Sequence, residues 1–365
     1  MRFGIDANPI FRTRAGVGQY AARLAERMSA SSPGDEFYLY RSGGDEGAGD
    51  AWLLRENVVV RKVSKSSLQA AVGSDRVDVF HGTNFRLRAR GRRGSVVTIH
   101  DLALKIFPHL RRRWLGDWFG HLKTARDARL SDRVIADSEA TARDVVRHIG
   151  LPREKVRVIL LAAGHEFRPA ADGERLAVVL RRIGMVRPRY VMFSGTLEPR
   201  KNVIVLLRAY LGLREDFVDV GLVLAGAPGW KSEGVTEFIR THGLAEDVRV
   251  TGYLTPEDIA TLYSGAAAFV LPSLYEGFGL PPLEAMACGA PVIVSNGGSL
   301  PEVVGDAAIV LPPDDAEGYR REMTRVLSSP DLAREMRRKG FLRAASFSWD
   351  RAAAETLAVY REVAT

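Results

Sequence analysis

The sequence contains only one cysteine, Cys288, and this scarcity excludes several classes of protein. One cysteine permits no disulfide within the chain and no zinc site built from several thiolates, which fits a reducing compartment such as the cytoplasm. We expect Cys288 to be a buried, inert residue. No uninterrupted apolar stretch of about 18 residues occurs, so we expect no helix that spans a membrane. The first residues, MRFGIDANPI, have no long apolar run behind a basic segment, and we expect no signal peptide.

Clusters of metal ligands are also missing from the sequence. The histidines and carboxylates do not gather at the spacings that hold a metal ion, and we predict no metal site. The chain likewise lacks internal repeats and low-complexity tracts. What remains is a globular composition, with 46% hydrophobic and 26% charged residues. The 365 residues are enough for two domains of roughly 150–200 residues each.

Positive charge is concentrated in the first half of the chain. Residues 1–168 contain 30 Lys and Arg against 19 Asp and Glu, a net charge of +11, whereas the remainder has a net charge of −3. This asymmetry indicates that the first half meets an anionic partner. An Arg-rich surface without a specific partner is the alternative.

Short apolar, β-branched runs alternate with helical stretches along the whole chain. Such alternation predicts parallel sheets that helices cover on both faces, and one series in each half predicts two Rossmann-like domains. The predicted strands cover residues 2–6, 36–40, 58–63, 77–80, 96–100, 133–137 and 156–160 in the first half, and 190–194, 220–225, 248–251, 267–271, 291–295 and 307–311 in the second.

Both periodic patterns are interrupted by AAGHEFRPAAD at residues 162–172, where a glycine and a proline are typical of a linker. We therefore predict an N-terminal domain over residues 1–168 and a second domain over residues 169–345. The segment 346–365 predicts a final amphipathic helix with Ser348 as its N-cap.

The stretch LYEGFGLPPLEAMACGAP at residues 274–291 carries the most specific motif. It follows a predicted strand, and its glycines allow the backbone to come close to a ligand and expose amide donors. Pro282 suits the first turn of a helix. Glu276 in the loop and Glu284 in the first helical turn provide two carboxylates, which accept hydrogen bonds from sugar or ribose hydroxyl groups. The alternative is an ordinary helix start, where the negative charge of Glu284 complements the helix dipole. This alternative explains only Glu284.

A second constellation, SGTLEPRKN at residues 194–202, also follows a predicted strand. Gly195 and Pro199 shape a turn, after which Arg200 and Lys201 lie at the start of a helix. Two adjacent cations suit a diphosphate leaving group, whose negative charge grows as a glycosidic bond breaks. A solvated, charged helix cap is the alternative.

These motifs resemble those of the GT-B-fold glycosyltransferase family 4, a large group of retaining enzymes. The E-x7-E motif of the family matches Glu276 to Glu284, and its basic pair matches Arg200 and Lys201. The resemblance extends over essentially the whole chain, including GVGQY near the start, the strand before the HD dipeptide, and GGSLPEVVGDAA. It implies an α/β GT-B fold, in which two Rossmann-like domains with parallel sheets face each other and a C-terminal helix crosses back towards the first domain.

The resemblance assigns roles to matching positions and implies a nucleotide diphosphate sugar as the donor. Arg200 and Lys201 would bind its diphosphate, and Glu284 would bind the ribose hydroxyl groups. Glu276 would orient the sugar and support it electrostatically. The remaining donor-binding positions are Gly16, Gly18, Gly195, Tyr253, Leu254, Gly277, Phe278, Gly279 and Leu280, of which Tyr253 and Leu254 match the segment that meets the base.

In the first half, Gly16 and Gly18 resemble a glycine loop that lies against the phosphates, although many family members have adjacent glycines there. His100 would sit near the reacting sugar from the opposite domain. A hydrogen bond from His100 to Asp101 or to a backbone carbonyl is the structural alternative. For Ser138 we expect a helix cap rather than a substrate contact.

The resemblance thus predicts a retaining, metal-independent hexosyltransferase that needs no cofactor. It favours transfer from GDP-mannose to a glycan or lipid-linked acceptor in polysaccharide or glycoconjugate synthesis, with the acceptor approaching the basic first domain. A nucleotide-sugar epimerase or hydrolase on the same fold is one alternative. A non-catalytic, nucleotide-sugar-binding partner subunit is another.

Basic and aromatic residues gather in two segments, RLRARGRR at residues 86–93 and RRRWLGDWFGHL at residues 111–122. A helix over the second segment either packs its aromatic residues in the core, which we favour, or makes peripheral contact with an anionic membrane. Nucleic-acid binding is not expected, because the aromatics share one helical face. The apolar residues with helical spacing are Trp114, Leu115, Trp118, Phe119 and Leu122, directly after Arg111, Arg112 and Arg113.

Overall fold

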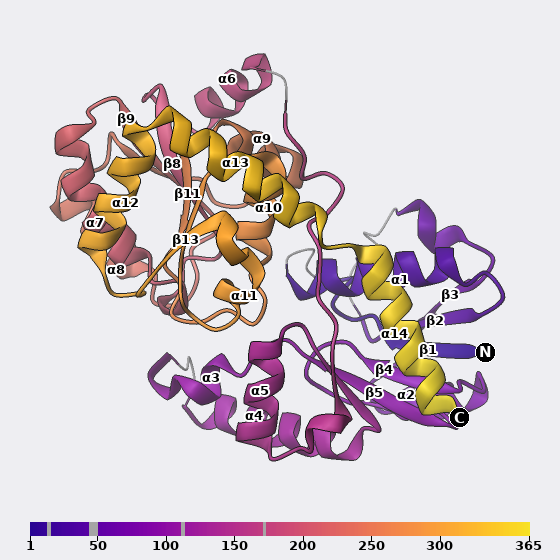
Figure 1. Ribbon diagram of the computed structural model, residues 1–365. Helices are drawn as coiled ribbons and strands as arrows, with labels where there is room; N and C mark the ends of the chain where they lie inside the picture. The colour runs from indigo at the N-terminus through magenta and orange to yellow at the C-terminus, as the bar shows by residue number, and fades with distance from the viewer. Residues whose placement is uncertain (13–15, 44–49, 111–113, 171–172) are drawn as a thin grey trace. The chain divides into compact units, whose positions relative to one another are not determined.

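The computed structural model describes residues 1–12, 16–43, 50–110, 114–170 and 173–365, without the side chains of residues 114–118. The chain divides into two compact units, Met1–Leu161 with Ser348–Thr365, and Ala162–Phe347 (Figure 1). These divisions differ from the predicted boundaries at residues 168 and 345. The first lies earlier because Phe167, within the predicted linker, is 6% exposed and packs against Tyr263 in the core of the second unit.

The first unit is built around a seven-stranded parallel sheet with the strand order β3-β2-β1-β4-β5-β6-β7. Its strands are β1 (Arg2–Asp6), β2 (Glu36–Arg41), β3 (Val58–Lys62), β4 (Val79–Gly82), β5 (Gly94–Ile99), β6 (Arg133–Ala136) and β7 (Val156–Val158). Its helices are α1 (Val17–Ser31), α2 (Leu68–Ser74), α3 (Ala103–Ile106), α4 (Trp114–Leu130), α5 (Glu139–Ile149) and α14 (Trp349–Ala364), with 3-10 helices at Ala51–Leu54, Pro108–Leu110 and Arg153–Lys155.

The C-terminal helix α14 belongs to the first unit, where it packs along α1 (Figure 1). It begins after Ser348, whose hydroxyl oxygen accepts hydrogen bonds from the backbone N–H groups of Asp350 and Arg351, as expected for its N-cap. Tyr360 is fully buried, and its ring lies 5.0 Å from the ring of Phe3 on β1. The last residues of the chain therefore complete the core of the first unit.

The second unit holds a six-stranded parallel sheet with the order β10-β9-β8-β11-β12-β13. Its strands are β8 (Arg189–Ser194), β9 (Val220–Ala225), β10 (Val248–Val250), β11 (Ala268–Leu271), β12 (Val292–Ser295) and β13 (Ala308–Leu311). Its helices are α6 (Gly173–Arg182), α7 (Val203–Asp216), α8 (Glu233–Thr241), α9 (Pro256–Gly265), α10 (Leu280–Cys288), α11 (Leu300–Val304), α12 (Ala316–Ser328) and α13 (Pro330–Ala345), with 3-10 helices at Pro199–Lys201 and Gly305–Ala307.

The predicted strands match those of the structure to within two residues at each end. Strands such as β9 and β11 are buried along their whole length, because helices cover both faces of a parallel sheet. Nearly continuous apolar runs are therefore the pattern that this fold requires, and they made the strands visible in the sequence.

The strand order of each sheet reverses at one point, between β1 and β4 in the first unit and between β8 and β11 in the second. At such a point the connections leave neighbouring strands in opposite directions, and ligands of open α/β sheets bind there at the carboxyl edge. In the second unit the loops at this edge are residues 195–202 and 272–279, which contain the predicted donor-binding motifs.

Candidate active site

Two loops whose interacting residues are 75 positions apart in the sequence meet where β8 and β11 are neighbours. The loop after β8 carries Arg200 and Lys201 in a 3-10 helix, and the loop after β11 carries Glu276. The backbone N–H of Leu274 donates to the carbonyl oxygen of Arg200 at 2.8 Å, which ties the two loops together. The fold thus unites the two motifs that the sequence singled out.

Glu276 is the centre of a buried ion-pair cluster. Its Oε2 accepts a hydrogen bond from Arg200 Nη1 at 2.8 Å, and its Oε1 accepts one from Lys201 Nζ at 2.7 Å. The Ser273 hydroxyl donates to the same Oε1 at 2.5 Å. Burial of Glu276, which is 6% exposed, disfavours its charge, but the two cations and Ser273 outweigh burial and lower its pKa from 4.5 to about 2. The carboxylate is therefore ionised at neutral pH.

Further contacts orient the two cations before a ligand is present. The guanidinium of Arg200 also donates to Glu198 Oε1 at 3.0 Å and to the carbonyl oxygen of Tyr275 at 2.8 Å. Gly195 has a φ of 140°, and a Cβ atom there would lie 3.2 Å from Lys201 Cε, so the glycine leaves room for the lysine side chain. Two carboxylates, those of Glu198 and Glu276, therefore balance the two cations.

The loop from Glu276 to Gly279 is held by a segment to which the sequence assigned no role. Ser299 donates through its backbone N–H and its hydroxyl to the carbonyl oxygen of Glu276, each at 3.0 Å, and its hydroxyl also lies 2.6 Å from the carbonyl oxygen of Phe278. A Cβ atom on Gly298 would lie 2.2 Å from the Glu276 carbonyl oxygen, so only glycine fits there. The sequence signal that could have revealed this contact is the GGSLP string at residues 297–301.

Glu284 is a largely buried residue of α10, with 9% of its surface exposed. The helix begins at Leu280, after the left-handed cap residue Gly279, so Glu284 lies in the second turn and not in the first turn that we predicted. Burial and then the nearby charge of Glu284 raise the pKa of Tyr263, which stays neutral beside the carboxylate. Cys288 is buried, as predicted, and burial and the same charge raise the pKa of its thiol to about 12.

Tyr253 and Leu254 lie in the loop after β10, beside a cavity of about 490 Å³. The Tyr253 side chain is 72% exposed, whereas Leu254 is 8% exposed and packs in the core. Leu254 therefore fixes the loop, and the Tyr253 ring remains available to a planar ligand.

Gly16 and Gly18 lie at the start of α1 in the first unit. Gly16 precedes the helix with a φ of 48°, a left-handed value that favours glycine, and Gly18 is buried in the first turn. Residues 13–15, just before this turn, lie outside the described part of the chain. The helix start follows β1 at the point where the first sheet reverses its order.

His100 follows β5 and has an acceptor at each ring nitrogen. Its Nδ1 lies 2.6 Å from Asp137 Oδ2, and its Nε2 lies 2.9 Å from the carbonyl oxygen of Thr83. Burial lowers the pKa of His100, but the charge of Asp137 and the two hydrogen bonds outweigh it, and the net pKa is raised. Acceptors at both ring nitrogens suit the protonated form of the ring, which donates from each of them. The carboxylate that pairs with the ring is Asp137, not Asp101, which accepts instead from the backbone N–H of Ala103.

A buried chain of hydrogen bonds runs through the core of the first unit, and the sequence did not reveal it. Tyr360 on α14 lies 2.6 Å from His81 Nδ1, and His81 Nε2 lies 2.7 Å from the Thr98 hydroxyl, which in turn is 2.8 Å from the hydroxyl of Tyr20. Burial and the charge of His100 lower the pKa of His81 to about 3. The edge of the Tyr20 ring meets His100 at a centroid distance of 4.9 Å. The chain thus connects α14 to the surroundings of His100.

The prediction that α4 buries its aromatic residues is wrong for the part of α4 whose side chains are described. Phe119 is 52% exposed and Leu122 is 44% exposed. The helix instead turns Ala125 and Ala128 into the core beneath the sheet, which places the larger residues outside. Arg111, Arg112, Arg113 and the side chains of Trp114, Leu115 and Trp118 lie outside the described residues.

The helix cap that we predicted at Ser138 is confirmed. Its hydroxyl oxygen accepts a hydrogen bond from the backbone N–H of Thr141 at 3.0 Å at the start of α5. The same Thr141 donates its hydroxyl to the carbonyl oxygen of His100 at 3.1 Å. The capped helix therefore also supports the end of β5.

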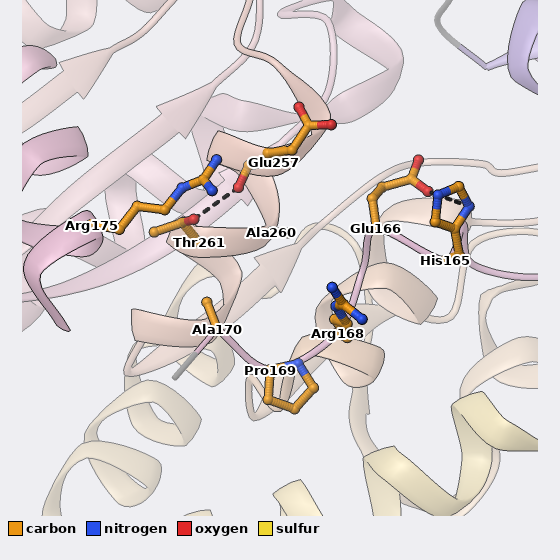
Figure 2. A pocket seen from close by; sticks show the side chains of 9 residues that line it. All are labelled: His165, Glu166, Arg168, Pro169, Ala170, Arg175, Glu257, Ala260 and Thr261. Atoms are coloured by element: carbon orange, nitrogen blue, oxygen red, sulfur yellow. Dashed lines mark hydrogen bonds and ion pairs between the residues drawn. The ribbon is translucent and has the colours of Figure 1, made fainter. Parts of the chain in front are cut away.

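A cavity of about 460 Å³ in the second unit is lined by residues 165–170 and by one face of α9 (Figure 2). Arg168, Arg175 and Glu257 give it charges of both signs, and the Thr261 hydroxyl donates to the carbonyl oxygen of Glu257 at 2.8 Å. None of the predicted donor-binding residues lines this cavity. We assign it no role in the reaction.

Two protein families match the chain, one in each half. The model of Glycosyltransferase Family 4 matches residues 14–162, and the model of Glycosyl transferases group 1 matches residues 184–343. Together they cover most of both units. The chain belongs to the group 1 glycosyltransferases.

This glycosyltransferase resembles known proteins along its length. It is 29% identical over 384 residues to the O-antigen chain mannosyltransferase B of Escherichia coli. The alignment covers 99% of this chain and 100% of that protein. It is 33% identical over 263 residues to the serotype-specific mannosyltransferase WbdA of the same organism, over 70% of this chain but only 32% of that longer protein. The solved structure of sucrose-phosphate synthase from Thermosynechococcus elongatus covers 100% of this chain and is itself covered to 99%, with a TM-score of 0.78 at 19% identity. This likeness confirms the predicted fold of two Rossmann-like domains with parallel sheets.

Two further observations hold for the described ranges of the glycosyltransferase. No group of three or more His, Cys, Asp or Glu side chains there is arranged to hold a metal ion. No helix within the same ranges is long and apolar enough to cross a bilayer. The metal-independent reaction stays a prediction.

Proposed function

We propose that this glycosyltransferase moves a hexose, with retention of anomeric configuration, from a nucleotide diphosphate sugar to a hydroxyl group. The observation that carries the proposal is the convergence of Arg200 and Lys201 on the buried carboxylate of Glu276 at the carboxyl edge of the second sheet. Two fixed cations at this edge match the charge of a diphosphate, and their positions are set before the ligand arrives.

In this proposal the diphosphate takes over the hydrogen bonds that Arg200 and Lys201 make to Glu276 in the free enzyme. The backbone of residues 277–280 leads into the start of α10, where the N–H of Leu280 can meet an anionic oxygen atom, whereas Pro281 and Pro282 have no N–H to donate. The released carboxylate of Glu276 then lies beside the sugar, whose hydroxyl groups can donate hydrogen bonds to it.

The nucleoside would extend away from the cations along the carboxyl edge. Glu284 is the carboxylate that accepts hydrogen bonds from the ribose hydroxyl groups. Tyr253 and the backbone of Leu254 meet the base, which is supported by the high exposure of the Tyr253 ring beside its cavity.

The chemical step breaks the bond between the sugar C1 and the phosphate oxygen and forms a bond between C1 and the acceptor oxygen on the same face. Arg200 and Lys201 stabilise the negative charge that grows on the departing phosphate. A phosphate oxygen takes the proton of the acceptor hydroxyl. Glu276, ionised and not itself bonded to the sugar, offsets the positive charge on the ring. The catalytic role that the resemblance implies for His100 stays a prediction, since Asp137 and the Thr83 carbonyl already accept from its two ring nitrogens.

GDP-mannose is the donor that we propose, and polysaccharide synthesis is the proposed role. The names of the two mannosyltransferase relatives support mannose as the sugar, and the name of the O-antigen chain enzyme supports the role in polysaccharide synthesis. Calorimetric titration with GDP and UDP tests the nucleotide, with tighter binding of GDP expected. A clear preference for UDP contradicts GDP-mannose but leaves the reaction class in place.

Transfer assays with a labelled donor and a mixture of glycan acceptors test the reaction itself. Arg200→Ala and Lys201→Ala should each slow transfer by roughly a hundredfold to a thousandfold, since each loses one preorganised contact to the developing charge. Arg208→Ala, at an exposed position on α7 in the same unit, is the matched control and should retain full activity. Epimerised or hydrolysed donor without any transferred sugar would establish one of the alternative activities.

We also propose that the enzyme works in the cytoplasm, in peripheral contact with the inner face of a membrane. Exposed Phe119 and Leu122 on α4, beside exposed Lys123 and Arg126, combine apolar and cationic side chains as membrane interfaces require. Co-sedimentation with anionic vesicles should fall in a Phe119→Ser/Leu122→Ser variant and in high salt. Equal, negligible binding of the wild type to anionic and neutral vesicles contradicts the contact.

A further inference from the structure

Two cavities of about 390 Å³ each adjoin one another in the first unit, on either side of the basic segment that follows β4. Arg86 and Arg88 line both. We name them the Phe85 basin and the Arg126 basin. The Phe85 basin is further lined by side chains that include Asn84, Phe85, Asp101, Leu104 and Lys105. The Arg126 basin is further lined by side chains that include Lys65, Gln69, Arg90, Arg126, Asp127 and Leu130.

The Phe85 basin lies beside the proposed catalytic histidine. Phe85, which lines it, meets the His100 ring edge-on at a centroid distance of 5.4 Å. Asn84 and Asp101 follow β4 and β5 directly, so the basin lies at the carboxyl edge of the first sheet. An aromatic ring next to amide and carboxylate groups is suited to a saccharide, which presents C–H faces and hydroxyl groups together.

The Arg126 basin is cationic. Five basic side chains line it, and three of them are ion-paired: Arg86 with Asp127 at 2.6 Å, Arg88 with Asp6 at 3.2 Å and Arg90 with Asp132 at 3.3 Å. Among the residues that the structure describes, Lys65 and Arg126 form no ion pair, and both are exposed. These uncompensated charges favour a phosphate group.

We propose that the two basins form the acceptor site, with the saccharide in the Phe85 basin and a phosphate of the same molecule in the Arg126 basin. The acceptor is then a glycolipid whose sugar is joined to its lipid through phosphate. Leu104 and Leu130, which are 42% and 47% exposed, each line one of the basins and provide apolar surface for the start of the chain. This inference rests on the proposed function, and it gives two of the basic residues of the first half, Lys65 and Arg126, a specific role.

Binding of synthetic acceptors to the enzyme saturated with the tighter-binding nucleoside diphosphate tests the proposal, because the donor cations are then occupied. The probes are a decyl disaccharide with a diphosphate between sugar and chain, and the same decyl disaccharide without phosphate. The test variant is Lys65→Ser/Arg126→Ser. The matched control is Arg143→Ser/Arg147→Ser, which removes the same charge from exposed positions on α5 of the same unit.

We expect the wild type to bind the diphosphate probe at least tenfold more tightly than the neutral probe, and Lys65→Ser/Arg126→Ser to lose about tenfold in affinity for the diphosphate probe alone. The control variant should bind both probes as the wild type does. Equal binding of both probes by the wild type overturns the proposal, as does an equal loss in the control variant. Displacement of the diphosphate probe by a short RNA at equal concentration also overturns it, since the basin would then favour another polyanion. The affinity for the nucleoside diphosphate, measured separately, should be the same in every variant as in the wild type. If the wild type does not bind the nucleoside diphosphate at all, that result contradicts the proposed function and not the acceptor site.

Discussion

Replacing Glu276 by glutamine isolates the charge that neutralises the two proposed donor-binding cations. The substitution keeps the size of the side chain and an acceptor oxygen, and it removes the negative charge that lies 2.8 Å from Arg200 Nη1 and 2.7 Å from Lys201 Nζ. In the free wild-type enzyme, a diphosphate must displace this carboxylate before it can bind both cations. We therefore expect Glu276→Gln to bind nucleoside diphosphates more tightly than the wild type while it transfers sugar more slowly.

The size of the effect follows from the pKa of Glu276, which is lowered from 4.5 to about 2 because the cations outweigh burial. Since one pKa unit corresponds to about 1.4 kcal/mol, the surroundings favour the ionised carboxylate by about 3 kcal/mol. A diphosphate competes with only part of this stabilisation, and a tenfold gain in affinity, or about 1.4 kcal/mol, is the expected result. Transfer should slow by roughly a hundredfold to a thousandfold, as for the loss of one preorganised charge.

Calorimetric titration with GDP and UDP, together with initial transfer rates, measures both effects. Glu198→Gln is the matched control, because Glu198 contacts Arg200 but is less buried than Glu276, and its loss should raise affinity less. Glu276→Asp keeps the charge and should keep the weaker affinity. Wild-type or weaker diphosphate affinity in a Glu276→Gln enzyme that is still folded at the assay temperature would refute the competition that we describe.

The acid stability of the same variant gives an independent check. The folded pKa of Glu276 is lowered, so its ion pairs stabilise the fold fully above pH 4.5 and lose this effect as the pH falls towards 2. Glu276→Gln removes that dependence. Unfolding free energies of the two proteins should therefore approach one another in acid, and a difference that is constant from pH 7 to pH 3 contradicts the lowered pKa.

Three further predictions concern the metal and the two buried histidines. Transfer should survive exhaustive treatment with a chelator, and loss of activity that magnesium or manganese restores would reveal a metal site. The pKa of His81 is lowered to about 3, so the fold loses stability as the pH falls below the unfolded pKa of about 6.5. Between pH 7 and pH 5 the free energy of unfolding should fall by about 2 kcal/mol more in the wild type than in His81→Gln. An equal fall in both proteins contradicts a neutral His81. The pKa of His100 is raised, so its contribution to stability is lost as the pH rises through the folded pKa; Asp137→Asn should make the ring titrate at lower pH by nuclear magnetic resonance, and an unchanged titration contradicts the assigned pair.

The strands and the donor motifs could be predicted because each depends on neighbours in the sequence. Buried parallel strands need continuous apolar runs, and ligand loops follow directly after such strands, as at Gly195 and Gly277. The cap at Ser138 likewise needs only an N–H group three residues on. For such features the local pattern contains most of the relevant physics.

Helix position and burial were predicted less well, because they depend on the surface against which a helix packs. Phe119 and Leu122 have the spacing of a core face, but the smaller Ala125 and Ala128 pack beneath the sheet in their place. Glu284 lies one turn later than expected because Gly279 adopts a left-handed cap that starts α10 at Leu280. The boundary between the units lies before residue 168, at the start of the predicted linker, because the core of the second unit accommodates Phe167.

The sequence by itself determined that two α/β units exist, that carboxylates and cations follow their central strands, and that the first half is basic. Only the tertiary structure decided that Glu276 pairs with both Arg200 and Lys201, that His100 pairs with Asp137, and that Tyr360 at the end of the chain reaches His81. The reason is physical. Secondary structure and loop position follow from interactions between residues a few positions apart, whereas the charge and protonation of a buried group are set by partners that the order of strands in a sheet brings within hydrogen-bond distance.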